Sequence, residues 1–301
     1  MRNKFSDTIY KLSKVNNKIF VVAADISPSG KMAEFQAQKK NFINVGVSEQ
    51  VMIGICAGLA LSGMKPFAYT IAPFSLFRPF EMVRDDLCYQ KLPVTVVGMG
   101  AGTVYANLGG THTAIEDISI ARSLPNMQVL SPCDPLELEN CVNFCANKST
   151  KPTYLRIGKT GEKDFTKNSI DKWEFGKIRK IKNGKDVCIL SHGPIISMAY
   201  DVEKKVKEKI SIYSCHTLKP FDEKKMKMIF KKYKKIITLE DHSEIGGLSE
   251  LVKLNAYKNS YRGKISTFSL KDDFLHVYSS QKDLLNSHGI SVNKIIKKII
   301  N

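Results

Sequence analysis

Residues 42–70 read FINVGVSEQVMIGICAGLALSGMKPFAYT, and this stretch decides the fold class. The run Phe42–Val45 is short and mostly apolar, as in a buried strand. Glu49–Leu61 is apolar over roughly three and a half helical turns, and Pro66–Thr70 returns to the pattern of a strand. Two strands joined by a helix of this length predict a βαβ unit, in which the strands lie parallel.

The same alternation of strand and helix extends on both sides of this unit. In the first half, further strands are predicted at Ile19–Ala24, Val94–Val97, Met127–Leu130 and Thr153–Ile157, and further helices at Phe80–Gln90, Glu116–Arg122 and Pro135–Ala146. In the second half, strands are predicted at Val187–Ser191, Ile210–Tyr213, Ile236–Glu240 and Ile265–Ser269, and helices at Ile195–Lys209, Asp222–Lys232, Gly247–Tyr257 and Gln281–His288. This pattern predicts an α/β fold with two parallel or mostly parallel sheets flanked by helices.

The length of the chain and one polar stretch suggest two domains. A chain of 301 residues fits one large domain or two ordinary ones. Gly158–Gly176 is polar and weakly patterned. We place a linker within it at residues 166–176, between a first domain at 1–165 and a second at 177–301.

Composition excludes several classes of protein. The hydrophobic content of 43% is ordinary for a globular chain, and the most apolar stretch, Val51–Met64, is shorter than a membrane-spanning helix. The N-terminus lacks the apolar core of a signal peptide. The seven cysteines include no CxxC pair, which argues against a disulfide framework or a zinc cluster. We therefore expect a reduced cytoplasmic protein with no membrane partner.

The formal net charge of +17 comes largely from lysine runs in the second half of the chain. Such runs fit either an electrostatic footprint for nucleic acid or solvated helix faces. Basic and aromatic residues do not alternate here as they do in single-strand nucleic-acid platforms. The solvated-face interpretation is therefore favoured, and no nucleic-acid partner is expected.

Candidate site residues follow the carboxyl ends of the predicted strands, where open parallel sheets bind ligands. Glu49 stands in the first turn of an apolar helix, where helix-end electrostatics alone favour a carboxylate, although its apolar neighbours favour a functional role. His112 lies in a glycine-rich loop, where it could contact a phosphate, shuttle a proton or bond its own backbone. Phe74 and Phe77 are either core residues or a wall against a planar ring.

Taken together, these segments are similar to a known family. The runs GVSEQVMIGICAGLALSGMKPFAYT, QKLPVTVV, GGTHTAIEDI and LPNMQVLSPCD, followed by TLKPFD and LEDHSEIGGLSE, resemble the C-terminal half of transketolase. The resemblance covers nearly the whole chain. It implies a thiamine diphosphate pyrimidine-binding domain followed by a transketolase C-terminal-like domain, related also to 1-deoxyxylulose-5-phosphate synthase.

The resemblance assigns cofactor-binding residues. Glu49 corresponds to the family glutamate that hydrogen-bonds the aminopyrimidine ring of thiamine diphosphate and acts catalytically by assisting proton transfer. Ile71, Phe74 and Phe77 correspond to the aromatic wall around that ring, with Ile71 standing where phenylalanine is common. Asp25 matches an acidic position that follows the first strand. The cofactor supplies the carbanion chemistry, and the protein supplies orientation.

The resemblance also assigns substrate-binding residues. His112 matches a catalytic histidine over the substrate channel, and Arg156 matches an arginine that contacts the substrate phosphate. Leu108 replaces an aspartate that contacts substrate hydroxyls in transketolases. Leucine accepts no hydrogen bond, so ordinary pentose phosphates are not the expected substrates.

One family motif is missing from the chain. Transketolases bind the cofactor diphosphate and its metal ion through a G-D-G…N motif in an N-terminal domain, and this chain has no such motif. The resemblance therefore implies a split enzyme, in which two copies of this chain join two N-terminal-half subunits in a heterotetramer. Mg²⁺ or Ca²⁺ would be held by the partner subunit, with no metal ligand supplied here.

Three functions fit these observations. The first is transfer of a two-carbon ketol unit between sugar phosphates or activated sugars, by analogy in a surface-polysaccharide pathway. The second is condensation of a decarboxylated 2-keto acid with an aldehyde, as in deoxyxylulose phosphate synthesis. The third is a non-catalytic regulatory partner. The sequence identifies neither the donor and acceptor sugars nor the pathway.

Overall fold

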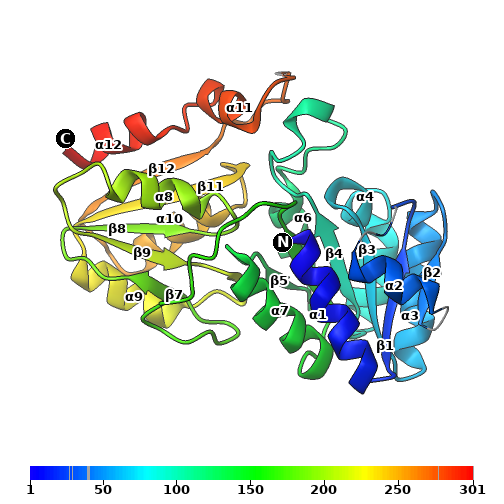
Figure 1. Ribbon diagram of the computed structural model, residues 1–301. Helices are drawn as coiled ribbons and strands as arrows, with labels where there is room; N and C mark the ends of the chain where they lie inside the picture. Colours follow the sequence, from blue (N-terminus) through cyan, green and yellow to red (C-terminus); the bar gives the residue numbers. More distant parts are fainter. Residues whose placement is uncertain (27, 29, 39–40, 277, 301) are drawn as a thin grey trace.

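Two sheets lie side by side in the computed structural model, which describes residues 1–26, 28, 30–38, 41–276 and 278–300 (Figure 1). The first sheet contains β1 (Ile19–Ala23), β2 (Phe42–Asn44), β3 (Lys65–Ile71), β4 (Thr95–Met99), β5 (Gln128–Leu130), β6 (Thr153–Ile157) and β10 (Thr217–Lys219). Its strand order is β10-β5-β6-β4-β3-β1-β2, and only β10 runs antiparallel to its neighbour.

Helices cover both faces of the first sheet. On one face lie α1 (Arg2–Val15), α2 (Lys31–Ala37) and α7 (Pro135–Asn147). On the other lie α3 (Glu49–Leu61), α4 (Ala72–Leu76), α5 (Phe80–Met82), the π-helix η1 (Val83–Tyr89) and α6 (Asp117–Ser123). Successive strand residues pack against opposite faces, as Val21 and Val22 do. Burial on both faces explains why the strands are nearly continuous apolar runs.

The second sheet is built in the same way. It contains β7 (Arg179–Lys182), β8 (Val187–Ser191), β9 (Ile210–Ser214), β11 (Lys235–Ser243) and β12 (Lys264–Leu270), in the order β12-β11-β8-β9-β7 with β7 antiparallel. The helices α8 (Ile196–Glu203), α11 (Gln281–Ser287) and α12 (Val292–Ile300) cover one face, and α9 (Glu223–Lys232) and α10 (Leu248–Lys258) cover the other.

The two sheets share part of their core. One apolar cluster contains Met52 and Ile118 from the helices of the first sheet together with Leu248 and Val252 from α10. The strand β10 also comes from the second half of the chain yet completes the edge of the first sheet beside β5. The halves of the chain are therefore interlocked rather than joined only by the segment between them.

The predicted α/β class with mostly parallel sheets is confirmed, and each predicted strand has a counterpart within a few residues. The sequence pattern does not predict β7 and β10, because short, partly polar edge strands have no apolar periodicity. It treats residues 72–76 as a loop, whereas Pro73 stands at the start of α4, where proline is favoured. The predicted helix Ile195–Lys209 is shorter in the structure, where α8 ends at Glu203 and the chain continues through a turn toward β9.

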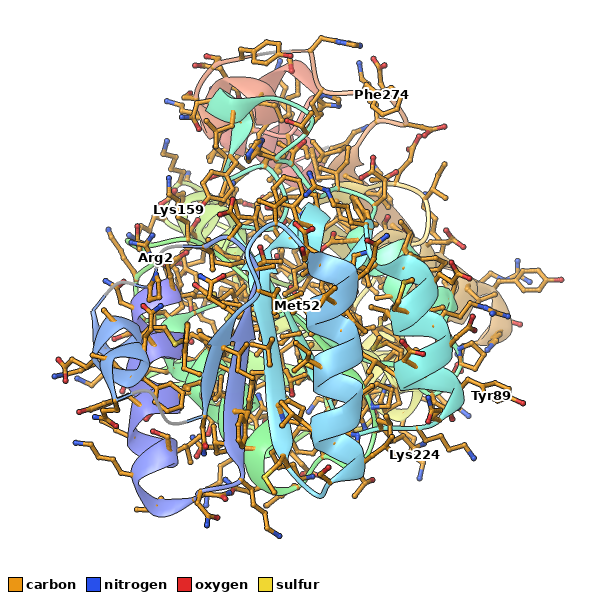
Figure 2. The ribbon with its side chains drawn as sticks, turned by 90° about the vertical axis from the view of Figure 1, so that its right-hand side faces the viewer. Arg2, Met52, Tyr89, Lys159, Lys224 and Phe274 are labelled. Atoms are coloured by element: carbon orange, nitrogen blue, oxygen red, sulfur yellow. The ribbon has the colours of Figure 1, made fainter. Side chains whose placement is uncertain are left out.

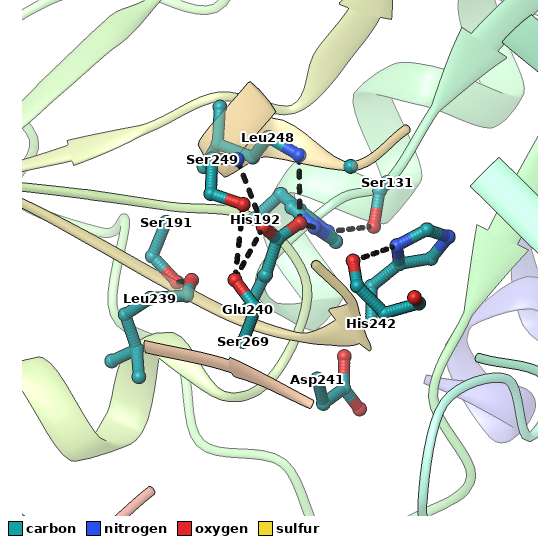
Figure 3. A network of polar contacts seen from close by, with 12 residues as sticks. Ser131, Ser191, His192, Leu239, Glu240, Asp241, His242, Leu248, Ser249 and Ser269 are labelled. Atoms are coloured by element: carbon teal, nitrogen blue, oxygen red, sulfur yellow. Dashed lines mark hydrogen bonds and ion pairs between the residues drawn. The ribbon is translucent and has the colours of Figure 1, made fainter. Parts of the chain in front are cut away.

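A buried carboxylate fixes the start of α10 (Figure 3). Glu240 on β11 accepts hydrogen bonds from the backbone N–H groups of Leu248 at 2.7 Å and Ser249 at 2.8 Å. The Ser269 hydroxyl donates at 3.0 Å, and His192 Nε2 lies 3.4 Å away. Burial opposes ionisation of Glu240, but these hydrogen bonds and the nearby histidines outweigh it and lower the pKa to about 2.

Replacing Glu240 with glutamine should lower the free energy of unfolding by about 3 kcal/mol, because the backbone donors of α10 lose a charged acceptor. Since the folded pKa lies below the ordinary 4.5, the stabilisation by Glu240 is present above pH 4.5 and is lost as the pH falls toward 2. Urea unfolding across this range should show the difference between wild type and E240Q shrinking as the pH falls. S269A, which removes one neutral hydrogen bond, should cost only about 1 kcal/mol; equal effects of the two variants would contradict this account.

Candidate active site

The candidate site lies at the carboxyl ends of β2, β3 and β4. The helix α3 begins shortly after β2, α4 follows β3 directly, and the loop 100–116 follows β4. This loop contains the short helix η2 (Ala106–Leu108) and the glycines at 109 and 110. Because these strands are parallel, their following segments meet at one edge of the sheet, as the strand pattern predicts.

Glu49 is the first residue of α3, and its side chain is almost completely buried, with 5% of the residue exposed. Its Oε1 accepts a hydrogen bond from Arg78 Nη1 at 2.9 Å. The helix N-terminus favours the carboxylate through its backbone dipoles. The Arg78 side chain is about half exposed, so the ion pair joins a buried acid to a base at the surface.

An aromatic contact continues from this ion pair. The Arg78 guanidinium lies over the Phe74 ring, 4.2 Å from its centroid. The Phe74 ring meets His112 edge-on, with 5.4 Å between the ring centroids. The structure thus brings Glu49, Phe74 and His112, all predicted site residues, into one connected group with Arg78.

A cavity of about 500 Å³ opens beside this group. Phe74 and Phe77 form one wall, and the loop residues Gly110 and Thr111 belong to another. Phe274 and Leu275, which precede α11, close it from the second half of the chain. Figure 2 shows Phe274 near the top of the molecule, above the face on which α3 lies. A mostly apolar cavity of this size can hold a planar ring.

Glu116 adds a titratable group to the same cavity. Burial, followed by the charges of Asp117 and Asp272, raises the pKa of its carboxyl above the ordinary value, although backbone N–H groups partly oppose this. A carboxyl with a raised pKa carries its proton closer to neutral pH than an exposed one.

Three predicted site residues lie apart from this group. Ile71 packs into the core on the other face of the sheet, under α1 and α7, while Phe77 packs on the α3 side. Asp25 is exposed beyond β1, in a left-handed backbone conformation. Leu108 is exposed at the end of η2.

Arg156 is buried in an ion-pair cluster. Its Nε donates to Asp117 Oδ2 at 2.9 Å and its Nη1 to Asp241 Oδ1 at 3.0 Å. Tyr154 donates to the same Asp117 oxygen at 2.7 Å. Burial opposes the charge of Arg156, but the two carboxylates outweigh it and raise the pKa of the guanidinium. The two carboxylates would repel a substrate phosphate at this position, so the structure gives Arg156 a role in joining the two halves.

Both halves of the chain match models of known protein families. Residues 1–161 match "Transketolase, pyrimidine binding domain", and residues 176–295 match "Transketolase, C-terminal domain". The chain belongs to the transketolase family. The resemblance found in the sequence is thereby confirmed.

Individual members of the transketolase family show how much of each protein is shared. An apulose-4-phosphate transketolase subunit of Phocaeicola vulgatus is 28% identical over 300 residues, covering 98% of this chain and 95% of that protein. 1-deoxy-D-xylulose-5-phosphate synthase of Clostridium perfringens is 31% identical over 276 residues, covering 90% of this chain and 44% of that protein. A solved structure described as "Split gene transketolase, inactive beta4 tetramer" has a TM-score of 0.88 and 30% identity, covering 99% of this chain and 96% of that one.

The residues beside the cavity fit part of the transketolase cofactor. The Phe74 and Phe77 rings offer a flat apolar wall to an aminopyrimidine ring, and the buried Glu49 carboxylate, which contacts the cavity residue Arg78, is a hydrogen-bond acceptor of the kind that such a ring could use. Within the described residues, no group of three or more His, Cys, Asp or Glu side chains could hold a metal ion. Nor is any helix in the described part of this transketolase-family chain long and apolar enough to cross a membrane.

Sequence reasoning missed four of the residues that shape the site. Arg78 lies in the turn that follows α4, and no local pattern in the sequence shows that this turn folds the guanidinium back over Phe74. Glu116 stands in a loop already singled out, but nothing in the sequence shows that its side chain is half-buried beside the cavity. Phe274 and Leu275 reach the site only through tertiary packing and carry no local signal.

Replacing Arg156 with methionine should destabilise the protein by about 3–5 kcal/mol, because Asp117 and Asp241 would remain buried without their cation. Urea unfolding measures this loss. R84M is the matched control, because Arg84 forms an exposed ion pair with Asp85 that should contribute less than about 1 kcal/mol. An R156M protein that unfolds at the wild-type urea concentration would refute the structural role of the cluster.

Proposed function

We propose that this chain is the C-terminal subunit of a split, thiamine diphosphate-dependent transketolase-like enzyme. Its alignment spans 95% of a protein named as a transketolase subunit and 96% of a split-gene transketolase chain. It spans only 44% of a synthase whose chain is longer. This coverage supports a subunit that works with a separate N-terminal half.

The buried Glu49 carboxylate beside an aromatic cavity is the observation that carries the proposal. Glu49 would hold the aminopyrimidine ring of the cofactor by accepting a hydrogen bond at its carboxylate, and Phe74 and Phe77 would enclose the ring. Binding would require Arg78 to share or release Glu49 Oε1, which its half-exposed side chain allows. Thiamine diphosphate, when bound, supplies the carbanion chemistry of the transfer.

His112 would serve the substrate side of the cavity. Its ring is partly exposed, its Nδ1 lies 2.9 Å from the Thr111 hydroxyl, and Thr111 lines the cavity. A histidine held in this way can donate to a substrate oxygen or move a proton. Ile71 would support the wall from behind, whereas Leu108 and Asp25 are not among the residues that line this cavity.

The partner subunit would cover an exposed apolar face of α3, which Figure 2 turns toward the viewer. Val51 is 53% exposed and Leu61 67%, and Val47 just before the helix is also exposed. Gly54 and Gly58 lie on the same helix, and a Cβ added to either would meet nothing. A smooth apolar face of this kind favours close helix packing. The partner would also hold the cofactor diphosphate and its Mg²⁺ or Ca²⁺ ion.

A phosphorylated sugar is the substrate class that we propose, because a relative that aligns with this chain over 95% of its own length is named for apulose-4-phosphate. The similarity to 1-deoxy-D-xylulose-5-phosphate synthase supports a second candidate, the condensation of a 2-keto acid with an aldehyde. The two candidates differ in their donor substrate. The seven buried, unpaired cysteines support a reducing compartment such as the cytoplasm.

Replacing Glu49 with glutamine should reduce the activity of the assembled enzyme by at least about a hundredfold, because the proton-transfer role of the carboxylate is lost. Turnover with a ketose phosphate donor and with pyruvate, measured on this chain mixed with its N-terminal-half subunit, tests the role and separates the two candidate reactions. E81Q is the matched control, since Glu81 is an exposed glutamate on the neighbouring α5. Full activity of the E49Q enzyme would refute the catalytic role of Glu49 and favour a non-catalytic function for this chain.

Replacing Val51 with glutamate should weaken binding of the N-terminal-half subunit at least roughly tenfold, because a charge would enter an apolar interface. Calorimetry of the mixture measures this, together with thiamine diphosphate and Mg²⁺ binding, which we expect only when both subunits are present. V15E is the control on α1, where Val15 is 84% exposed and lies outside the proposed interface. Tight cofactor binding by this chain alone would overturn the two-subunit proposal.

A further inference from the structure

A second cavity, of about 490 Å³, lies between residues 159–165 and α8, and we call it the linker pocket. It lies at the junction of the two halves, because residues 159–165 follow β6 of the first sheet and α8 covers the second. Val104, from the loop that also carries His112, and Gln281 of α11 complete its walls. None of the residues assigned to the candidate active site lines this pocket.

Three lysines give the linker pocket a cationic side: Lys159, Lys163 and Lys204. Two acids also line it: Glu162 is paired with the terminal amine of Met1, whereas Asp201 is exposed and takes part in no ion pair among the described residues, so the lysines outnumber the free acid by three to one. Lys159 is held with its Nζ 4.7 Å from the centroid of the Tyr105 ring. Lys163 and Lys204 are exposed, and neither takes part in an ion pair with any residue that the structure describes. This side of the pocket therefore favours an anion.

The opposite side of the linker pocket is apolar and aromatic. The rings of Phe165 and Tyr200 are stacked, with centroids 4.8 Å apart and planes inclined by 27°. The Tyr200 hydroxyl donates to the Phe165 carbonyl at 3.2 Å, which fixes this pair. Ile195 and Leu285 add buried apolar surface beside the rings. A flat apolar group would find contact area here.

The linker pocket is built on fixed backbone. A Cβ at Gly158 would overlap the Glu162 carboxylate and the Pro194 ring, so only glycine allows the two segments to approach this closely. On the far side, Gln281 Nε2 donates to the buried Thr103 hydroxyl at 3.0 Å and ties α11 to the loop that carries Val104. The walls therefore come from three segments that are each held by their own contacts. Figure 2 places Lys159 and Phe274, which mark the two cavities, on opposite sides of the upper part of the molecule.

We propose that the linker pocket binds a nucleotide-sized organic phosphate. The volume suits a ligand of that size, the lysines suit its phosphate groups, and the stacked rings suit its planar part. A sugar phosphate would use the lysines but leave the aromatic wall bare. A purely apolar ligand would leave the excess of lysine charge in the lining without an anionic partner.

Adenosine 5′-diphosphate is the probe, titrated by calorimetry into the 301-residue chain. Adenosine and inorganic phosphate, which carry the two halves of the recognition chemistry, should each bind more weakly than the intact probe. The double variant K163Q/K204Q should weaken binding of the probe roughly tenfold, since each exposed charge contact contributes modestly. The matched double variant K167Q/K205Q removes two exposed lysines that do not line the pocket and should bind as wild type does.

A third variant tests the cavity rather than its charge. Ser197 is exposed and lines the pocket, so S197W should fill the space and abolish binding while all three lysines remain. The proposal is overturned if the probe fails to bind at millimolar concentration, or if its affinity is unchanged in K163Q/K204Q or in S197W. Inorganic phosphate binding as tightly as the probe would also overturn it, because the aromatic wall would then play no part. Since all these measurements use this chain alone, their failure would leave the two-subunit enzyme untouched.

Discussion

The charge of Arg156 is the constraint on which the arrangement of the two halves depends. The Arg156 side chain extends from β6 and forms ion pairs with Asp117 at the start of α6 and with Asp241 on β11. All three side chains are buried. Charges buried at this depth are tolerated only together, so the three elements must be positioned jointly. The loop 100–116 runs between β4 and α6, and a Cβ at Gly102 would overlap the Asp241 carboxylate. The ion-pair cluster therefore helps to shape the cavity beside Phe74, although none of its residues lines that cavity.

The local sequence of α3 predicts that it is a helix but not which of its faces is buried. Its residues are apolar on all sides, a composition expected of a helix that is fully enclosed. In this chain Met52 and Ile53 face the core, while Val51 and Leu61 face outward. The pattern thus predicted the helix, but could not show which of its sides this chain would cover.

The strands and the position of Glu49 could be predicted from short-range patterns, because apolar runs and helix starts depend on residues that are close in the sequence. The partners of Arg156 could not be foreseen, since Asp241 lies far along the chain and its approach depends on packing between the two sheets. The same holds for Phe274, which reaches the cavity from the end of the second half. Arg78 is an intermediate case, because its contact with Phe74 is local but depends on α4 and on the turn that follows it, in a segment that the sequence pattern treats as a loop.

The strand β10 has a consequence for how the protein is made. A ribosome releases β5 and β6 well before residues 217–219, so the edge of the first sheet lacks its last strand while much of the second half is still being synthesised. An open parallel edge offers unpaired backbone groups to any other strand nearby. The first half cannot finish folding as a separate unit, and newly made chains are exposed to mispairing until the second half arrives.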